Sequence, residues 1–198
     1  MRHNLLVRIA TTVAGVVLLV IAATAFAHPP FRSQGMKAGA ELRYPVRLTG
    51  IPHKLRRRLR LPHLPADATC PVSTPGPTGV DLGLGLGKGP AYPIGFDEQS
   101  TLHYAGVRFP RPWTGNKVLW VVEPSYRGPV LIRGRQLNGR WWLGFDRGER
   151  PYVEMHIAGD GTEWTEYPSY TRVRARGCYG YQIDGRAFSR IIVFRVAP

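Results

Sequence analysis

Short apolar runs separated by turn residues dominate the chain from Cys70 onward. Over residues 130–137 the pattern alternates, with Ile132 on one face of an extended strand and Arg133 and Arg135 on the other. A period of two residues is typical of a strand with one buried face. This part of the chain is therefore predicted to be built from strands.

Two turn signals support that interpretation, because Asn138-Gly139 and Asp184-Gly185 are the residue pairs that tight hairpins favour. Outside the N-terminal segment, no run of ten or more residues carries the 3.6-residue period of a helix. Strands are predicted over residues 101–109, 118–122, 130–137, 141–145, 152–157, 170–174, 179–183 and 188–196. Seven or eight short strands at this spacing predict an all-β sandwich.

The N-terminal segment has a different pattern. Residues 1–8 are basic, and residues 9–27 form an uncharged apolar run that ends in Ala25-Phe26-Ala27. The small residues at that point favour a cleaved signal peptide. The run of 19 residues also approaches the ~20 that a membrane span needs, so an uncleaved transmembrane helix stays open. Both alternatives predict export.

Residues 28–66 are predicted to be a basic, proline-rich linker before a domain at 67–198. The linker carries nine basic residues against one acidic residue, whereas the domain has 16 basic and 12 acidic residues. Most of the net charge of +14 therefore belongs to the N-terminal part, which disfavours a nucleic-acid-binding domain. Contact with a membrane or an anionic envelope polymer is predicted for Lys54, Arg56, Arg57, Arg58 and Arg60.

Cys70 and Cys178 are the only cysteines and lie near the two ends of the predicted domain. In an exported chain, such a pair predicts one structural disulfide. A redox or metal-binding pair is the alternative, but there is no CxxC motif and no histidine within four residues of either cysteine.

Candidate catalytic and metal-binding patterns fail in detail. The glycine-rich residues 81–89 lack the glycine and the hydroxyl residue that a phosphate-binding loop needs around Lys88. The histidines form no HxH or HExxH pattern, no serine lies in a G-x-S-x-G turn, and Glu163 and Glu166 have no defined geometry in a strand or loop. No catalytic residue, metal or cofactor is predicted, and we expect the protein not to be an enzyme.

Aromatic residues are the best indication of a binding site. Trp141 and Trp142 are adjacent, so on a strand one ring should face the core and the other solvent. Trp164 and Tyr126 lie in or beside turns. Exposed rings of this kind stack on sugars or form protein-binding patches, but they also close the ends of cores.

Several segments resemble, in the right order, a family of uncharacterised secreted or membrane-anchored bacterial proteins. The segments are Cys70-Pro71-Val72-Ser73, Lys117-Val118-Leu119-Trp120, residues 130–137, Gly177-Cys178-Tyr179-Gly180-Tyr181, and Phe188-Ser189 followed by Ile191-Ile192-Val193-Phe194. The resemblance implies an immunoglobulin-like β-sandwich and adds no reaction. By analogy with immunoglobulin cores, Trp120 is expected to pack against the disulfide.

The sequence thus favours a non-catalytic, exported cell-envelope module that faces the outside of the cytoplasmic membrane, either secreted or anchored. A carbohydrate- or protein-binding domain that uses exposed aromatic residues is the alternative. A hydrolase is the least favoured.

Overall fold

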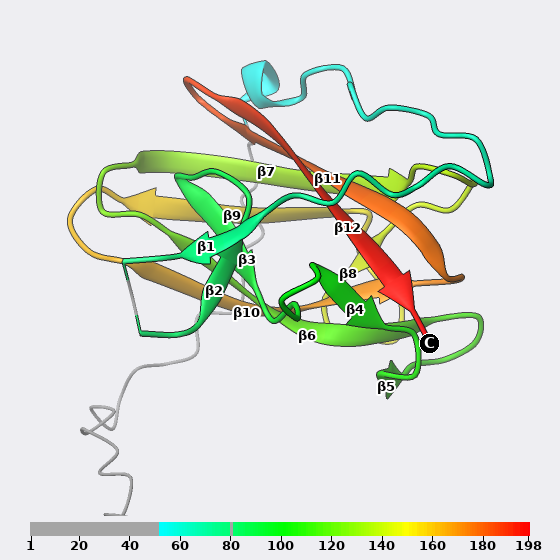
Figure 1. Cartoon of the computed structure of the whole chain (residues 1–198). Helices are drawn as coiled ribbons and strands as arrows, with labels where there is room; N and C mark the ends of the chain where they lie inside the picture. The colour runs from blue at the N-terminus through cyan, green and yellow to red at the C-terminus, as the bar shows by residue number, and fades with distance from the viewer. Residues whose placement is uncertain (1–51, 80) are drawn as a thin grey trace, which may run out of the picture. The chain divides into compact units, whose positions relative to one another are not determined.

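Two β-sheets form the domain in the computed structural model, which describes residues 52–79 and 81–198 (Figure 1). The first sheet contains β1 (Pro75–Pro77), β2 (Leu84–Leu86), β3 (Ala91–Ile94), β5 (Val107–Arg108), β6 (Thr114–Val122), β8 (Gly144–Phe145) and β10 (Thr165–Val173). The second contains β4 (Thr101–His103), β7 (Arg127–Gln136), β9 (Glu154–Asp160), β11 (Gly177–Gly185) and β12 (Ser189–Ala197). The prediction of an all-β domain is confirmed.

The first sheet has the order β1-β2-β3-β6-β10-β8, with β5 also paired to β6, and the second has the order β4-β12-β11-β7-β9. Every pairing is antiparallel except that of β4 with β12. The β6–β7 turn and the β9–β10 turn both connect the two sheets. They lie at the same end of the domain, because Val122 pairs with Thr165 and Arg127 pairs with Asp160.

The main core lies between the two sheets and is rich in aromatic rings. Trp120 of β6 meets Tyr181 of β11 edge to face at 5.1 Å, and Tyr181 stacks on Phe194 of β12 at 4.6 Å. All three side chains are fully buried. Such ring pairs add about 0.5–1.5 kcal/mol each beyond the burial of their surface.

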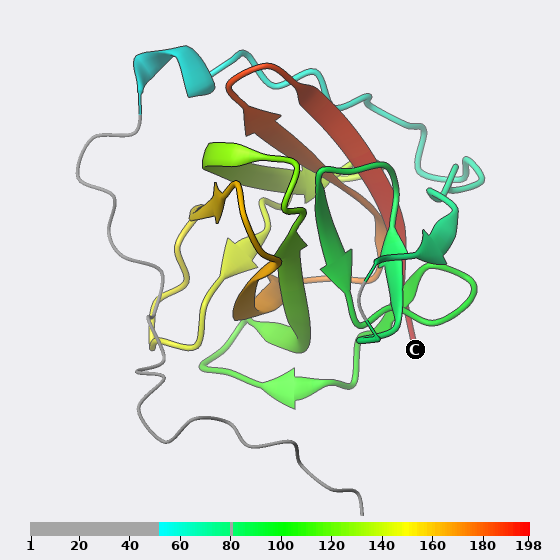
Figure 2. The same ribbon diagram turned by 90° about the vertical axis from the view of Figure 1, so that its left-hand side faces the viewer.

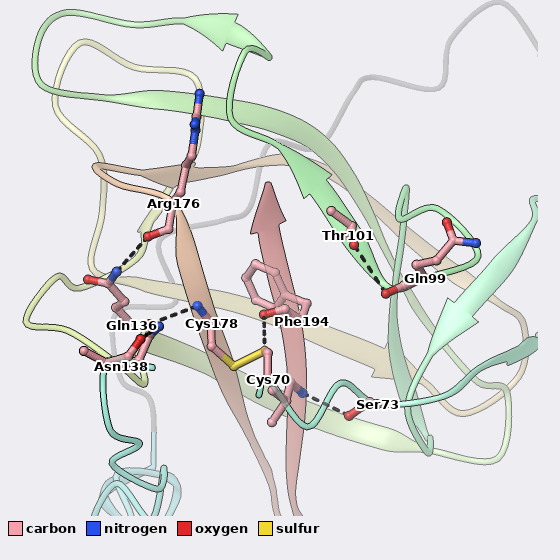
Figure 3. The surroundings of a disulfide bond; sticks show 11 residues. Cys70, Ser73, Gln99, Thr101, Gln136, Asn138, Arg176, Cys178 and Phe194 are labelled. Atoms are coloured by element: carbon pink, nitrogen blue, oxygen red, sulfur yellow. Dashed lines mark hydrogen bonds between the residues drawn. A yellow bond between two sulfur atoms is a disulfide. The ribbon is translucent and has the colours of Figure 1, made fainter. Parts of the chain in front are cut away.

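The predicted disulfide between Cys70 and Cys178 is confirmed, with an S–S distance of 2.00 Å and a Cα–Cα distance of 5.4 Å (Figure 3). The backbone N–H of Cys178 donates to the side-chain oxygen of Asn138 at 2.9 Å. The disulfide belongs to a second, smaller cluster with residues such as Leu137.

The expected contact between Trp120 and the disulfide is wrong. Tyr179 and Tyr181 of β11 point into the main core, so the alternating position Cys178 faces the opposite side of the strand. The disulfide therefore ties the segment before β1 to the outer face of the second sheet, and Trp120 lies on the far side of that sheet.

Residues 52–66, expected to be part of a solvated linker, instead pack along the outer face of the second sheet; we call them the strap (Figure 1). The strap begins with a short 3₁₀ helix, η1 (His53–Leu55). Leu55 and Leu61 are only 1% and 6% exposed. The rest of the expected linker, residues 28–51, lies outside the described residues.

Polar groups on the sheet explain why the strap binds there. Asp184 is fully buried and lies 2.8 Å from the guanidinium of Arg133 and 3.5 Å from that of Arg57 in the strap. The side chain of Gln182 accepts from the N–H of Arg60 at 2.6 Å and donates to the carbonyl of Arg58 at 3.2 Å. Buried groups of this kind need partners, and the strap supplies them.

The predicted strands after residue 100 are all present in some form, with shifted ends. The range 101–109 divides into β4 and β5, and the range 141–145 contains only the two-residue β8 plus an isolated bridge at Trp142. Asp184-Gly185 ends β11 and the hairpin turn follows it, closed by a hydrogen bond from the N–H of Gly185 to the carbonyl of Phe188. Strands β1, β2 and β3 were not predicted.

Residues 1–27, the predicted signal or anchor helix, lie outside the described residues. Within residues 52–79 and 81–198, no helix has both the length and the apolar character that a membrane crossing requires.

Candidate functional site

A cleft of about 550 Å³ lies beside the first residues of β6. Its charged and aromatic lining residues are Tyr104, Arg108, Phe109, Arg111, Trp113 and Arg174. Five of the six come from the short stretch between β4 and β6, and Arg174 follows the end of β10. The pairing of β6 with β10, which sets Thr114 opposite Val173, brings these two segments together.

Three arginines at alternating positions, Arg172, Arg174 and Arg176, hold the aromatic side of the cleft. Their guanidinium carbons lie 3.8 Å from the ring centre of Phe109, 4.3 Å from that of Trp113 and 5.8 Å from that of Tyr104, respectively. A guanidinium over a ring face is attracted by the ring quadrupole. Each arginine thus fixes one ring of the cleft.

Arg172 is fully buried and has a structural role. It donates to the backbone carbonyls of Asp146, at 2.7 Å, and of Gly148 and Glu149. Burial lowers the pKa of its guanidinium, and the nearby Asp146 opposes that shift. Arg172 therefore ties the loop after β8 to the ring of Phe109.

Arg174 lies between two indole rings, at 4.3 Å from the centre of Trp113 and 5.1 Å from that of Trp141. Its Nε is buried and has no hydrogen-bond partner among the described residues, and the same is true of the hydroxyl oxygen of Thr114, which also lines the cleft. A buried polar atom without a partner costs about 1–3 kcal/mol. The packing beside the cleft thus leaves two buried polar atoms unpaired within the described residues.

The cleft is positively charged. Arg108, Arg111 and Arg174 contribute three cations, and the lining residues include no carboxylate. Arg108 and Arg111 are exposed. Guanidinium groups donate two parallel hydrogen bonds to carboxylates and phosphates, and aromatic rings contact the apolar faces of flat ligands. The arrangement is suited to an anion that also carries rings.

No family model, curated protein or solved structure matches this chain. The family resemblance described above therefore stays a prediction, and the function has to be argued from the geometry of the site.

Of the aromatic residues singled out in the sequence, Trp141 lies next to Arg174 at the cleft and Trp142 pairs with Arg135 of β7. Trp141 is half-buried between the guanidinium groups of Arg140, at 4.7 Å, and Arg174. Trp142 is 51% exposed. The expectation that one of these adjacent rings faces solvent fits Trp142, whereas Trp141 packs on arginines and not in the main core.

The other two close the opposite end of the domain. The hydroxyl of Tyr126 donates to the carbonyl of Pro129 and accepts from the N–H of Arg186, and its ring meets Phe188 edge to face at 5.1 Å. Trp164 lies beside Tyr92, at 6.5 Å between ring centres. These rings pack on the protein itself, so the structure does not bring them together with Trp141 and Trp142.

The basic residues of the strap divide into two groups. Arg56 pairs with Glu154 at 2.6 Å. Arg57 forms an ion pair with Asp184 and donates to the carbonyls of the β11–β12 hairpin. The side chains of Lys54, Arg58 and Arg60 are exposed. Their predicted contact with a membrane or an anionic polymer stays a prediction.

The glycine-rich residues 81–89 take part in the first sheet, because β2 pairs with β1 and β3. Within the described part of the chain, no three His, Cys, Asp or Glu residues form a group that could hold a metal ion.

The cleft was not predicted, although the sequence contains two signals for it. Arginines alternate in Arg172-Val173-Arg174-Ala175-Arg176, and Arg108 and Arg111 are interleaved with the aromatic residues of 104–113. Alternating cations beside interleaved rings could have indicated a cationic, aromatic surface. That the two segments meet depends on the register of β6 and β10, which no local pattern reveals.

Proposed function

We propose that this protein is an exported, non-catalytic binding module whose cleft holds an acidic glycan. The observation that carries the proposal is the cleft itself, in which three arginines and three aromatic residues converge with no carboxylate among them. The arginines match the acidic groups of such a ligand, and the rings match the apolar faces of its sugars.

The position of the strap supports an envelope role. Arg57 in the strap binds the hairpin between β11 and β12, whereas the cleft lies beside the opposite end of β11, next to Arg174. Figures 1 and 2 place η1 and β5 on opposite sides of the domain. A module tethered through the residues before the strap would therefore hold its cleft away from the point of attachment.

The disulfide supports export, because such bonds persist in oxidising compartments outside the cytoplasm. Two mainly antiparallel sheets around a buried tryptophan support the proposal of an immunoglobulin-like sandwich. The placement of the disulfide on the outer face of one sheet differs from the bridge between sheets in antibody domains.

Calorimetric titration of the full chain, in detergent, tests the proposal. The ligands are a uronic-acid oligosaccharide, a neutral oligosaccharide of equal length and anionic lipid vesicles. We expect the double substitution Arg108→Gln with Arg111→Gln to weaken binding of the acidic oligosaccharide by about tenfold, which corresponds to about 1.4 kcal/mol. Both side chains are exposed, so the fold should be retained.

A matched control removes two charges elsewhere, by Arg190→Gln with Arg195→Gln on β12, where both side chains are also exposed. This variant should bind within about twofold of the native chain, because charges outside a contact act weakly in salt. The proposal would be overturned if the two variants lost affinity for the acidic oligosaccharide equally. It would also be overturned if the protein bound only the vesicles or showed no preference for the acidic over the neutral oligosaccharide.

A further inference from the structure

The cationic and aromatic surface extends beyond the cleft. Arg140, Trp141, Arg174 and Trp113 alternate in one row, with successive guanidinium-to-ring distances of 4.7, 5.1 and 4.3 Å. We call these four residues the arginine–tryptophan row. Only Trp113 and Arg174 line the cleft, so the other half of the row lies outside it.

The outer half of the row repeats the chemistry of the cleft. Arg140 is exposed and Trp141 is half-buried. A second cation and a second indole ring therefore stand next to the first, with Arg174 between the two rings.

The charges of the row are not neutralised by the protein. None of the ion pairs within residues 52–79 and 81–198 involves Arg140 or Arg174. The Nε of Arg174 is buried without a hydrogen-bond partner in the same part of the chain. If the row only packed the protein internally, its outermost cation, Arg140, would not need to be exposed. A ligand that carries several anionic groups complements both Arg140 and Arg174.

We propose that the ligand is a polymeric acidic glycan, of which one acidic sugar occupies the cleft and the next lies over Trp141 and beside Arg140. This inference rests on the proposed function of the cleft. It adds that the site binds two adjacent acidic sugars of the same glycan polymer. A single acidic sugar in the cleft reaches Arg174 and leaves Arg140 unused. A longer chain gains the second arginine and indole without a second loss of overall motion.

The test is a length series of uronic-acid oligomers, from the monomer to the hexamer, titrated into the full chain in detergent. The affinity should rise by about tenfold or more over the first added units and then level off, since a second cation and ring contribute about 1–2 kcal/mol. Arg140→Gln should leave the affinity for the monomer unchanged and reduce the gain with length to about twofold or less. Arg190→Gln, an equal change of charge on β12, should keep the full gain.

The outcomes separate the two proposals. Binding of the monomer with no gain on lengthening would overturn the extended site and leave the function of the cleft intact. Equal weakening of the monomer and the hexamer by Arg140→Gln would overturn the division into two subsites. Failure of every length to bind would overturn the proposed function itself.

Discussion

The substitution Asp184→Asn tests whether the strap is part of the folded domain. Three side chains donate to this buried carboxylate: Arg133 at 2.8 Å, Gln182 at 2.9 Å and Ser189 at 2.7 Å. Arg57 adds a looser ion pair at 3.5 Å. An asparagine keeps the shape but offers one acceptor oxygen, and its NH₂ group would face donors. The substitution also leaves the charge of Arg133 without a counterion in a site where that side chain is only 13% exposed.

The size of the effect follows from these contacts. Removal of one partner of a buried ion pair costs about 3–5 kcal/mol. Arg57 is one-third exposed, so solvent screens its share, and we expect a loss of unfolding free energy of about 3–4 kcal/mol. For a domain of this size that corresponds to a fall in Tm of roughly 10 °C.

Urea unfolding followed by tryptophan fluorescence, together with thermal melts, measures this loss. The control is Glu154→Gln, which removes a pair with Arg56 whose side chains are 21% and 48% exposed and should cost under about 1 kcal/mol. In the Asp184→Asn variant, trypsin should also cleave the strap under conditions in which the rest of the domain is still folded. If the two variants differ in stability by less than about 1 kcal/mol, the strap is not held by Asp184 and the reasoning is refuted.

Three further predictions concern the core and the disulfide. Cys70→Ser with Cys178→Ser should lower the unfolding free energy by about 2–5 kcal/mol in urea titrations, and an unchanged midpoint would contradict a structural role. Trp120→Ala should cost about 3–5 kcal/mol, because the ring is fully buried between the sheets; a native melting curve would be incompatible with its position. Burial, together with a hydrogen bond to a carboxylate, raises the pKa of Tyr92 to about 12, and burial also raises the pKa of Tyr181. Since these phenols keep their protons in the folded state, stability should be lost as the pH rises from about 10 through 12, and absorbance titrations should show delayed ionisation. Complete ionisation near pH 10 in the folded protein would argue against both shifts.

The strands after residue 100 could be predicted because their buried and exposed positions alternate and turn residues separate them. In β7, for example, Ile132 faces the main core, and Arg133 and Arg135 face the strap. Strands β1 to β3 were not predicted in this way, since residues 75–94 are rich in glycine and proline, which are depleted in strands. Leu82, Leu84 and Leu86 do alternate, but with glycines and not with polar side chains.

The strap and the cleft could not be predicted from the sequence for a different reason. Both depend on contacts between distant segments of the chain. Proline and net charge suggested a solvated linker, but Leu55 and Leu61 are spaced to enter the outer face of the second sheet, and Asp184 supplies the counterion for Arg57. Composition describes a segment alone and carries no information about a buried carboxylate more than a hundred residues away.

The position of β12 inside the second sheet has a consequence for the order in which this protein can fold. The strand lies between β11 and β4, so the second sheet stays divided until residues 189–197 are available. The strap also waits for the hairpin that β12 completes. We therefore expect the second sheet and the strap to be completed only after residues 189–197 have been synthesised, since pairings between distant segments form slowly and late. For an exported chain, as proposed above, that order would leave the second sheet open while the earlier segments are being synthesised.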